Sequence, residues 1–407
     1  MKKTAITLAA LFALLAGAAI ADNLPYITKV FDFQAAPGQF ANVLPEYVNG
    51  DTKADMIKKV QDRICGHITP PDTTEIGGET VIMPADTVCE GQLISLGAFG
   101  GYVVFGFDHP VVNVKGSTDF KVFGNAFQGD ATTSAGGSSE PGIVMVSKDV
   151  NHNGLPDDPW YELAGSEYSN PKTKHNYKIV YYRPEIAKNW KKDTCSVRWT
   201  SNDTDSLSAG KVDKNTFHAQ TFWPMWVDEP TLTFEGSKLP CNGYDESGKG
   251  TYWVQYFFDY GYVDNVPNTS PRAELNIEWA VDEDGKSVEL DQIDFVKVYC
   301  AENQMCGWLG ETSTEVTGAV DLHPNAKAAG VETVKQVSAT KLSAYVSHGE
   351  LVVINSGKAC RATIYSAGGK AVLTVDLGEG RNVVPADRLG RGVWIVRSAE
   401  GTAKVLL

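Results

Sequence analysis

The sequence predicts an all-β protein, with a large β-sandwich or jelly-roll-like central domain and a smaller β-sandwich at the C-terminal end. Short runs rich in β-branched and aromatic residues recur from residue 91 onward, and clusters of Gly, Pro, Asn and Asp separate them. Stretches with a helical period are nearly absent. Many short strands with regularly spaced turns are typical of antiparallel sandwiches and barrels rather than of α/β folds.

Residues 1–21 are predicted to be a secretory signal peptide. Lys2 and Lys3 precede an almost unbroken apolar run, and Ala19-Ile20-Ala21 supplies the small residues that signal peptidase requires. No later run approaches the roughly 18 apolar residues of a membrane-spanning helix. We therefore expect a soluble mature protein that is secreted or held at the outer cell surface.

Three further segments follow the signal peptide. Residues 22–90 are predicted to pack on the central domain, and the stretch EYVNGDTKADMIKKVQDRIC (46–65) can hold a helix of about three turns. The central domain is expected over residues 91–321, a length that one all-β domain can reach. Residues 322–340 are rich in Ala and Lys and poor in aromatic residues, which indicates a linker.

Residues 341–407 form the last predicted domain. They contain seven short strand-like runs, enough for a small Ig-like β-sandwich but too few residues to carry an elaborate active site as well.

The chain is acidic. Its formal net charge of −14 becomes −16 once Lys2 and Lys3 are removed with the signal peptide. This charge argues against nucleic acid as a ligand, because that binding depends on Lys and Arg that neutralise phosphates. An acidic surface suits a solvated extracellular protein, and it also favours cations.

Cysteines are expected to pair in an oxidising compartment. Spacing alone does not determine the connectivity. Pairing of nearest neighbours would join Cys65 with Cys89, Cys195 with Cys241, and Cys300 with Cys306, which leaves Cys360 over.

The stretch KDVNHNGLPDDPW (148–160) contains the clearest chemical motif. Its D-x-N-x-N-G pattern is typical of the first half of a calcium loop, because alternating oxygen acceptors can surround a cation and the glycine permits a sharp bend. A backbone carbonyl and a carboxylate would follow at the seventh and ninth positions. The predicted Ca²⁺ ligands are Asp149, Asn151, Asn153, Leu155 through its carbonyl, Asp157 and Asp158.

This loop departs from an EF-hand. Trp160 stands where an EF-hand has a bidentate Glu, and the flanking residues have the pattern of strands. Asp158 or Glu162 would have to supply the missing carboxylate. We expect a structural ion rather than a catalytic one; a turn without an ion is the alternative. The acidic turns at 259–265 (DYGYVDN) and 282–285 (DEDG) are plain turns or further cation sites.

Aromatic residues are predicted to form a ligand-binding surface. Trp and Tyr side chains offer rigid apolar faces with a polar edge, which suit a sugar ring or a flat macrocycle. Packing of nearly all of them in the core is the alternative. Within TYWVQYFFDYGY, alternation places Val254 and Tyr256 on one face of a strand and Trp253 and Gln255 on the other. The tryptophans predicted to be exposed are Trp190, Trp199, Trp223, Trp226 and Trp308.

Motifs for catalysis are absent from the sequence. It has no HExxH, no GxSxG, no P-loop and no dinucleotide-binding fingerprint. Carboxylate pairs such as Asp157 and Asp158 can flank a glycosidic bond, but a chain with 50 acidic residues contains such pairs by chance. No catalytic residue is predicted, and a secreted glycoside hydrolase remains an alternative.

The C-terminal sequence resembles a known family. ATIYSAGGKAVLTVDL, NVVPADRLGRGVWIVRS and the closing strand AKVLL are similar to the C-terminal sorting domain of type IX secretion cargo in Bacteroidota. This resemblance implies passage across the outer membrane through the type IX machinery, followed by surface attachment or release.

The central region also carries a resemblance. GAFGGYVVFGFDHPVVN, YGYVDN, DFVKVY and GWLGETSTEV are similar to a family of Bacteroidota cell-surface proteins, described as surface or PKD-like proteins. Some members lie beside genes for outer-membrane corrinoid uptake. Together with the motifs, this predicts a calcium-stabilised, non-catalytic surface protein whose ligand is a glycan or a corrinoid; a structural or adhesive protein is another alternative.

Overall fold

The prediction of a mostly β protein is confirmed. The computed structural model describes residues 23–66, 73–76, 79–82, 90–129, 135–186, 189–192, 195–214, 217–328, 341–347, 350–366, 370–384, 389 and 393–406. The predicted signal peptide, Cys89 and residues 329–340 lie outside them. The chain divides into two compact units, residues 1–328 and 329–407. Among the described residues no helix is both long and apolar enough to cross a membrane.

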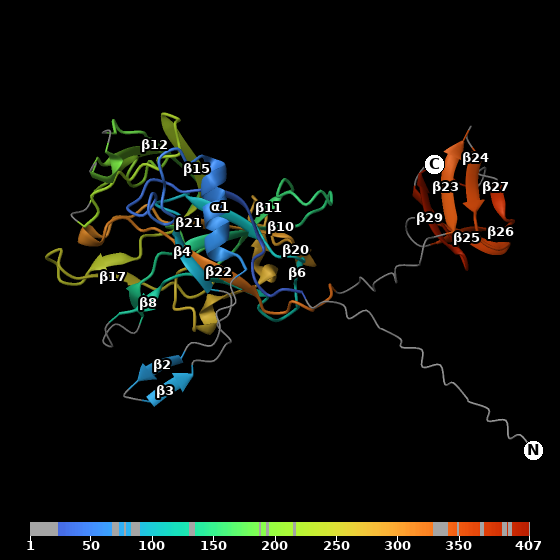
Figure 1. Ribbon diagram of the computed structural model, residues 1–407, viewed down its shortest axis with the longest axis horizontal. Coiled ribbons are helices and arrows are strands. Elements are labelled where there is room, and N and C mark those ends of the chain that lie inside the picture. The colour runs from blue at the N-terminus through green and yellow to red at the C-terminus, as the bar shows by residue number, and fades with distance from the viewer. Residues whose placement is uncertain are drawn as a thin grey trace, which may run out of the picture. The chain divides into compact units, whose positions relative to one another are not determined.

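α1 (Lys53–Ile64), the α-helix of the described residues, lies within the predicted stretch 46–65. A capping box begins it: the Asp55 N–H donates to Thr52 Oγ1 at 3.3 Å, and the Thr52 N–H donates to the Asp55 carboxylate at 2.8 Å. Met56, Val60 and Ile64 recur every four residues and are buried. This apolar face contacts three strands: β1 (Lys29–Gln34), β4 (Glu90–Ser95) and β22 (Glu315–Asp321) (Figure 1).

A six-stranded antiparallel sheet forms the centre of the larger unit. The N-terminal segment contributes the edge strand β1, which pairs with β5. The strand order is β1, β5 (Tyr102–Gly106), β21 (Phe295–Cys300), β10 (Gly142–Ser147), β11 (Trp160–Leu163) and β19 (Ala280–Val281).

Both faces of this sheet are covered. Val144 and Val146 of β10 belong to one apolar cluster, whereas Ile143 and Met145 contact the other, as strand alternation requires. The first cluster includes α1 and a four-stranded sheet with the order β18 (Glu274–Leu275), β7 (Phe120–Phe123), β22 and β4. The second includes a sheet with the order β14 (Ala209–Val212), β13 (Val197–Ser201), β12 (Lys174–Tyr182) and β15 (Thr231–Lys238).

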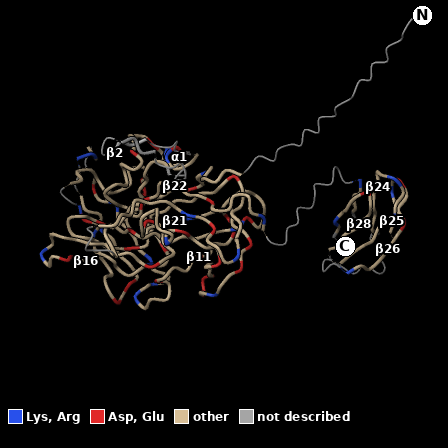
Figure 2. Tube along the Cα trace, turned by 90° about the horizontal axis from the view of Figure 1, so that it is seen from below, with Lys and Arg blue, Asp and Glu red and all other residues tan. Residues whose placement is uncertain are grey.

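Smaller sheets complete the larger unit. One four-stranded sheet has the order β16 (Gly243–Asp245), β17 (Trp253–Tyr256), β9 (Gly136–Ser138) and β8 (Phe127–Gln128). Two strand pairs are β2 (Thr73–Ile76) with β3 (Glu79–Ile82), and β6 (Val111–Val112) with β20 (Gln292–Ile293). Figure 2 shows that Asp and Glu are spread over many loops of this unit rather than confined to one segment.

The described residues of the second unit form seven strands in two antiparallel sheets. One sheet has the order β23 (Leu342–Ser347), β24 (Glu350–Asn355) and β27 (Gly380–Val384). The other has the order β26 (Ala371–Leu377), β25 (Cys360–Ser366), β28 (Val393–Ser398) and β29 (Gly401–Leu406). Leu351 and Val353 of the first sheet and Ile364 and Val396 of the second belong to one apolar cluster, so this unit has its own core.

The buried side chain of Asn42 helps to hold the aromatic segment 217–230 against the N-terminal part of the chain, beside the bonds from the Gly38 N–H to the Phe222 carbonyl (2.9 Å) and from Gln220 Nε2 to the Gln39 carbonyl (2.6 Å). Its Nδ2 donates to the carbonyls of Thr221 (2.9 Å) and Trp223 (2.8 Å). Its Oδ1 accepts from the Met225 N–H at 2.9 Å. Asn42 is fully buried, so no water can replace these bonds.

Asn42→Ala is therefore expected to lower the free energy of unfolding by about 3 kcal/mol or more, because three buried backbone groups lose their partner at roughly 1–3 kcal/mol each. Thr52→Ala, which removes only the exposed helix cap, should cost about 1 kcal/mol. Urea denaturation measures both. Equal losses in the two variants would contradict the role given to Asn42.

Candidate functional site

The predicted calcium loop connects β10 and β11, whose end residues Ser147 and Trp160 are paired. Its flanks are therefore strands, as predicted, and not the helices of an EF-hand. The loop is held by its own side chains: the Asp149 carboxylate accepts from the N–H groups of Asn153 (3.1 Å) and Gly154 (2.8 Å). Asn151 Oδ1 accepts from the Asn153 N–H at 2.9 Å.

The remaining predicted ligands lie in the same loop. Asn153 Oδ1 accepts from the Leu155 N–H at 2.8 Å, and the Asp157 carboxylate accepts from the amide groups of Asn151 (3.0 Å) and Asn153 (2.9 Å). These hydrogen bonds from the two side-chain amides lower the pKa of the Asp157 carboxyl group. Asp158 Oδ2 accepts from the Val150 N–H at 3.0 Å. The loop thus gathers five side chains with oxygen atoms, the donors that Ca²⁺ prefers.

Two acidic residues outside the predicted ligand set help to decide which carboxylate could complete the site. Asp294, which sequence reasoning missed, accepts from the Asp149 N–H at 2.8 Å and anchors the start of the loop. Glu162, the alternative source of a carboxylate, accepts from Ser237 Oγ at 2.7 Å and so is held against β15. Asp158 is therefore the better candidate for the additional ligand.

Three of the five candidate tryptophans are buried, so the prediction that they are exposed is wrong for Trp190, Trp199 and Trp223. Each packs within one of the apolar clusters of the larger unit. The Trp190 ring lies 5.6 Å from the Tyr47 ring, and Trp199 belongs to the core between β13 and its neighbours. Trp223 is fully enclosed, and its indole N–H donates to the Val227 carbonyl at 3.0 Å.

The other two tryptophans differ from each other. Trp226 is half-buried, with its ring 6.0 Å from the ring of Phe33 and packed against both apolar clusters. Trp308 keeps 48% of its surface exposed and meets the ring of Phe217 edge-on at 6.3 Å. Trp308 is therefore the one candidate tryptophan that is largely exposed.

A different set of aromatic residues lies on one open face of the β16–β17–β9–β8 sheet. Residues paired across neighbouring strands share a face. Tyr244 is paired with Val254, Tyr256 with Gly136, and Phe127 with Ser138. Tyr244 and Phe127 are 55% and 60% exposed, and the rings of Tyr244 and Tyr256 lie 5.9 Å apart. We call Phe127, Tyr244 and Tyr256 the aromatic face.

The opposite side of the same sheet packs on the protein. Gln255 is buried, and its amide donates to Thr312 Oγ1 at 3.4 Å. Gly243 lies against Cys306, since a Cβ at Gly243 would come within 2.3 Å of the Cys306 sulfur. The alternation predicted for residues 253–256 is thus confirmed, with Tyr256 outward and Gln255 inward.

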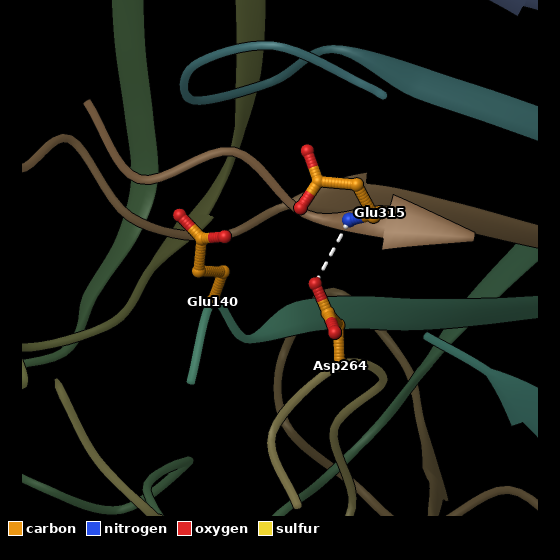
Figure 3. Close-up of side chains that lie close together, drawn as sticks. All are labelled: Glu140, Asp264 and Glu315. Carbon is orange, nitrogen blue, oxygen red and sulfur yellow. Dashed lines mark hydrogen bonds between the residues drawn. The ribbon is translucent and has the colours of Figure 1, made fainter. Parts of the chain in front are cut away.

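Beneath this sheet lies a group of buried carboxyl groups. Glu140, Asp264 and Glu315 bring one oxygen each within 4.8 Å of the others (Figure 3). Asp264 Oδ2 accepts from the Glu315 N–H at 2.9 Å, and its Oδ1 accepts from the N–H groups of Asn125 and Ala126, both at 2.7 Å. We call the three acidic residues the carboxyl cluster.

The carboxyl cluster has protonation states unlike those of surface acids. Burial raises the pKa of all three groups, and the charge of Glu140 raises those of Asp264 and Glu315 further. The carboxyl groups of Glu140 and Glu315 also lie close together, and this proximity helps to raise the pKa of Glu315. Three oxygen donors at this spacing could also hold a hard divalent cation.

Two more buried acids adjoin this region. Burial, with a smaller contribution from the charge of Glu140, raises the pKa of Glu302 well above its ordinary value and that of Glu311 to about 8. Glu302 Oε1 and Glu311 Oε2 are buried without a hydrogen-bond partner among the described residues. Such groups stay neutral unless a positive charge joins them.

Sequence reasoning found only part of this cluster. Asp264 falls within the turn 259–265, which was considered as a cation site, but Glu140 and Glu315 carried no motif. The second turn, 282–285, is a plain turn in which the Asp282 side chain accepts from the N–H groups of Asp284 (3.0 Å) and Lys286 (2.8 Å).

The predicted cysteine pairs that fall within the described residues do not form. Cys300 and Cys306 are both buried thiols, and Cys195 and Cys241 are not bonded to each other. Cys300 Sγ instead faces the carbonyls of Glu302 (3.8 Å) and Thr312 (3.5 Å).

Comparisons with known proteins assign no family to this chain. No family model matches it, and no curated protein matches it. A search of solved structures returns a Faecalibacterium prausnitzii Beta-glucuronidase at 10% identity and a TM-score of 0.12, covering 65% of this chain and 44% of that one. The chain thus spans less than half of that enzyme, and the likeness carries no argument about fold or function.

The buried carboxyl groups make stability depend on pH in a definite direction. Their folded pKa values lie above the value of 4.5 for an ordinary Glu, so their contribution is full below that pH and is lost as pH rises through the folded pKa, about 8 for Glu311. The free energy of unfolding should therefore fall between pH 5 and pH 8, by about 1.4 kcal/mol for each unit of raised pKa.

Urea denaturation at constant free calcium tests this dependence. Glu315→Gln mimics the protonated acid and should flatten the pH profile, whereas Glu289→Gln, an exposed acid in the same unit, should leave it unchanged. A profile that rises between pH 5 and pH 8, or that Glu315→Gln does not alter, would refute protonation of the cluster.

Proposed function

We propose that this chain is an exported, calcium-stabilised binding protein that holds a glycan non-covalently on the aromatic face. The observation that carries the proposal is the presence of three aromatic side chains on the outer side of one small sheet, with Tyr244 and Phe127 more than half exposed. Side chains of this size usually bury most of their surface, so their exposure together indicates a binding surface.

The shape of the aromatic face suits an extended sugar chain. Tyr244, Val254, Ser138 and Phe127 lie in one row across four strands, because β17 and β9 pair Tyr256 with Gly136 and Gln255 with Gly137. Neighbouring strands lie about 4.8 Å apart, so the two aromatic ends of the row are roughly 14 Å apart. Between them Ser138 is half-buried and Val254 is buried, so the stacking surfaces offered to sugar rings are the exposed rings of Tyr244 and Phe127 at the two ends of the row.

Polar groups at the edge of this face would orient a sugar. The Tyr256 hydroxyl donates to Glu246 Oε1 at 2.8 Å, and both residues remain accessible to a ligand hydroxyl. Of the two predicted ligand classes, the open and narrow face favours a glycan over a corrinoid, because a bulky macrocycle needs a deep concave pocket to bury most of its surface.

The remaining parts of the proposal concern architecture and export. The larger unit would be a β-sandwich of jelly-roll type, and residues 341–407 an Ig-like sandwich that serves as a type IX sorting domain. The separate apolar core of the C-terminal unit supports an independent module of this kind. The calcium ion of the loop 149–158 would be structural, because the loop connects two paired strands. The aromatic face lies on other elements.

Glycan binding should depend on the aromatic face. A glycan array identifies a ligand, and isothermal titration then measures its affinity for the wild type and for variants. Tyr244→Ala and Phe127→Ala should each weaken binding about tenfold, or roughly 1.4 kcal/mol, because each removes a stacking surface. Tyr260→Ala, another exposed aromatic residue outside the row, should bind normally.

Other outcomes of the same titration separate the alternatives. Saturable binding of cobalamin without binding of any glycan would replace the glycan by a corrinoid. Loss of glycan binding in Trp308→Ala but not in Tyr244→Ala would move the site to the Trp308–Phe217 pair. Turnover of chromogenic glycosides would make the protein a hydrolase.

Calcium should stabilise the larger unit through the loop 149–158. At a free calcium concentration 100 times the dissociation constant, the gain is about 2.7 kcal/mol, so EGTA should lower Tm by several degrees. Asp149→Asn and Asp157→Asn should remove most of this response, whereas Asp284→Asn in the plain turn should retain it. An unchanged Tm together with no bound calcium by elemental analysis would show that the loop binds no ion.

A further inference from the structure

A concave site lies on the larger unit, on strands other than those of the aromatic face. It is a cavity of about 180 Å³ between β11, β12, β15 and the residues that follow β19. Aromatic rings form part of its wall, namely those of Trp160, Tyr168 and Tyr299. We call it the acidic pocket, because four of its lining residues are acidic: Glu162, Glu235, Asp282 and Glu283.

Glu162 is the acid of the pocket whose side chain is held by a chain of hydrogen-bonded neighbours. Ser237 Oγ donates to Glu162 Oε2 at 2.7 Å and lies 3.0 Å from His175 Nδ1. The other ring nitrogen of His175 lies 3.1 Å from the Tyr168 carbonyl, and the two rings are 4.5 Å apart. Glu162 Oε1 makes no hydrogen bond with the described residues. A carboxyl group that is held in place through one oxygen can accept a hydrogen bond from a ligand with its other oxygen.

Acids outnumber bases in the pocket. Its described lining holds four acids, no Lys or Arg, and one base, His175, whose Nδ1 contacts Ser237 rather than Glu162. Among the described residues, the ion pair of a lining acid joins Glu235 to Lys178 at 3.5 Å between exposed side chains. Burial raises the pKa of Glu162 to about 7. Burial also raises the pKa of Tyr168, with contributions from the charges of Glu162 and Asp282. The pocket therefore favours a ligand that brings a positive charge.

We propose that the acidic pocket binds a small organic ligand through a protonated amine, with Glu162 as its counter-charge and the rings of Trp160 and Tyr168 as its walls. Aromatic faces attract ammonium groups and exclude water from the ion pair. The volume admits one small molecule or the end of a larger one, but no macrocycle. An amino sugar and a free amino acid with a side-chain amine share this chemistry.

Matched ligands test the proposal in isothermal titration with the full mature chain. Glucosamine should bind and glucose should not, because the two sugars differ only at the amine. Nα-acetyl-lysine amide and its neutral counterpart Nα-acetyl-norleucine amide form a second arm, which distinguishes an amino acid with a side-chain amine from a sugar as the source of the amine. Binding of the neutral member as tightly as the charged one, in both arms, would overturn the proposal.

Proton release gives a readout that a merely structural role of Glu162 would not produce. Because a protonated fraction of Glu162 must ionise when the cation binds, titrations at pH 7 in two buffers of different ionisation enthalpy should show release of a fraction of a proton. Glu162→Gln keeps the acceptor for Ser237 and should weaken binding at least tenfold without proton release. Glu289→Gln, with the same change of charge outside the pocket, should match the wild type.

Two results would refute the assignment. The first is that neither amine binds at millimolar concentration to wild-type protein whose Tm shows that it is folded. The other is amine binding that Glu162→Gln leaves unchanged. Tyr244→Ala should not affect amine binding, so the acidic pocket and the aromatic face can fail independently.

Discussion

The arrangement of the larger unit depends on one buried carboxyl group, that of Asp264. It accepts hydrogen bonds from the N–H groups of Asn125, Ala126 and Glu315, and the Asp264 carbonyl accepts from the Glu140 N–H at 2.9 Å. These bonds join segments that are up to 190 residues apart in the sequence, from 125 to 315. Asp264 adopts φ +56°, which costs free energy for a residue other than glycine. Gly124 is required beside it, since a Cβ there would lie 2.4 Å from Asp264 Oδ1.

This constraint positions the proposed glycan surface. Gln255 lies on the inner side of the β16–β17–β9–β8 sheet, and it hydrogen bonds to Glu140 and to Thr312. The aromatic face occupies the outer side of the same four strands. A surface held by a rigid support loses little side-chain freedom when a ligand binds, and that raises affinity for a given contact area. The predicted calcium loop and the acidic pocket both adjoin β11, which belongs to the central sheet and not to the sheet of the aromatic face.

Local sequence patterns predicted the secondary-structure elements better than they predicted which side chains lie at the surface. The capping box at Thr52 and the apolar spacing of Met56, Val60 and Ile64 act within a few residues, so the helix could be found from the sequence. The same holds for the D-x-N-x-N-G loop, whose internal hydrogen bonds link positions two to eight residues apart. Whether a tryptophan is exposed depends instead on distant contacts. Trp223 is buried because Asn42, 181 residues away, holds its segment in place. Glu140 and Glu315 approach each other through strand pairing that no local pattern encodes.

The account rests on the claim that a sugar binds on the aromatic face. A crystal structure of the mature chain soaked with the tightest glycan from an array measures this directly. The predicted result is a sugar ring stacked on Tyr244 or Phe127, with the ligand running along the row across the four strands. Sugar density at another surface, with an empty aromatic face at saturating ligand, would contradict the central claim.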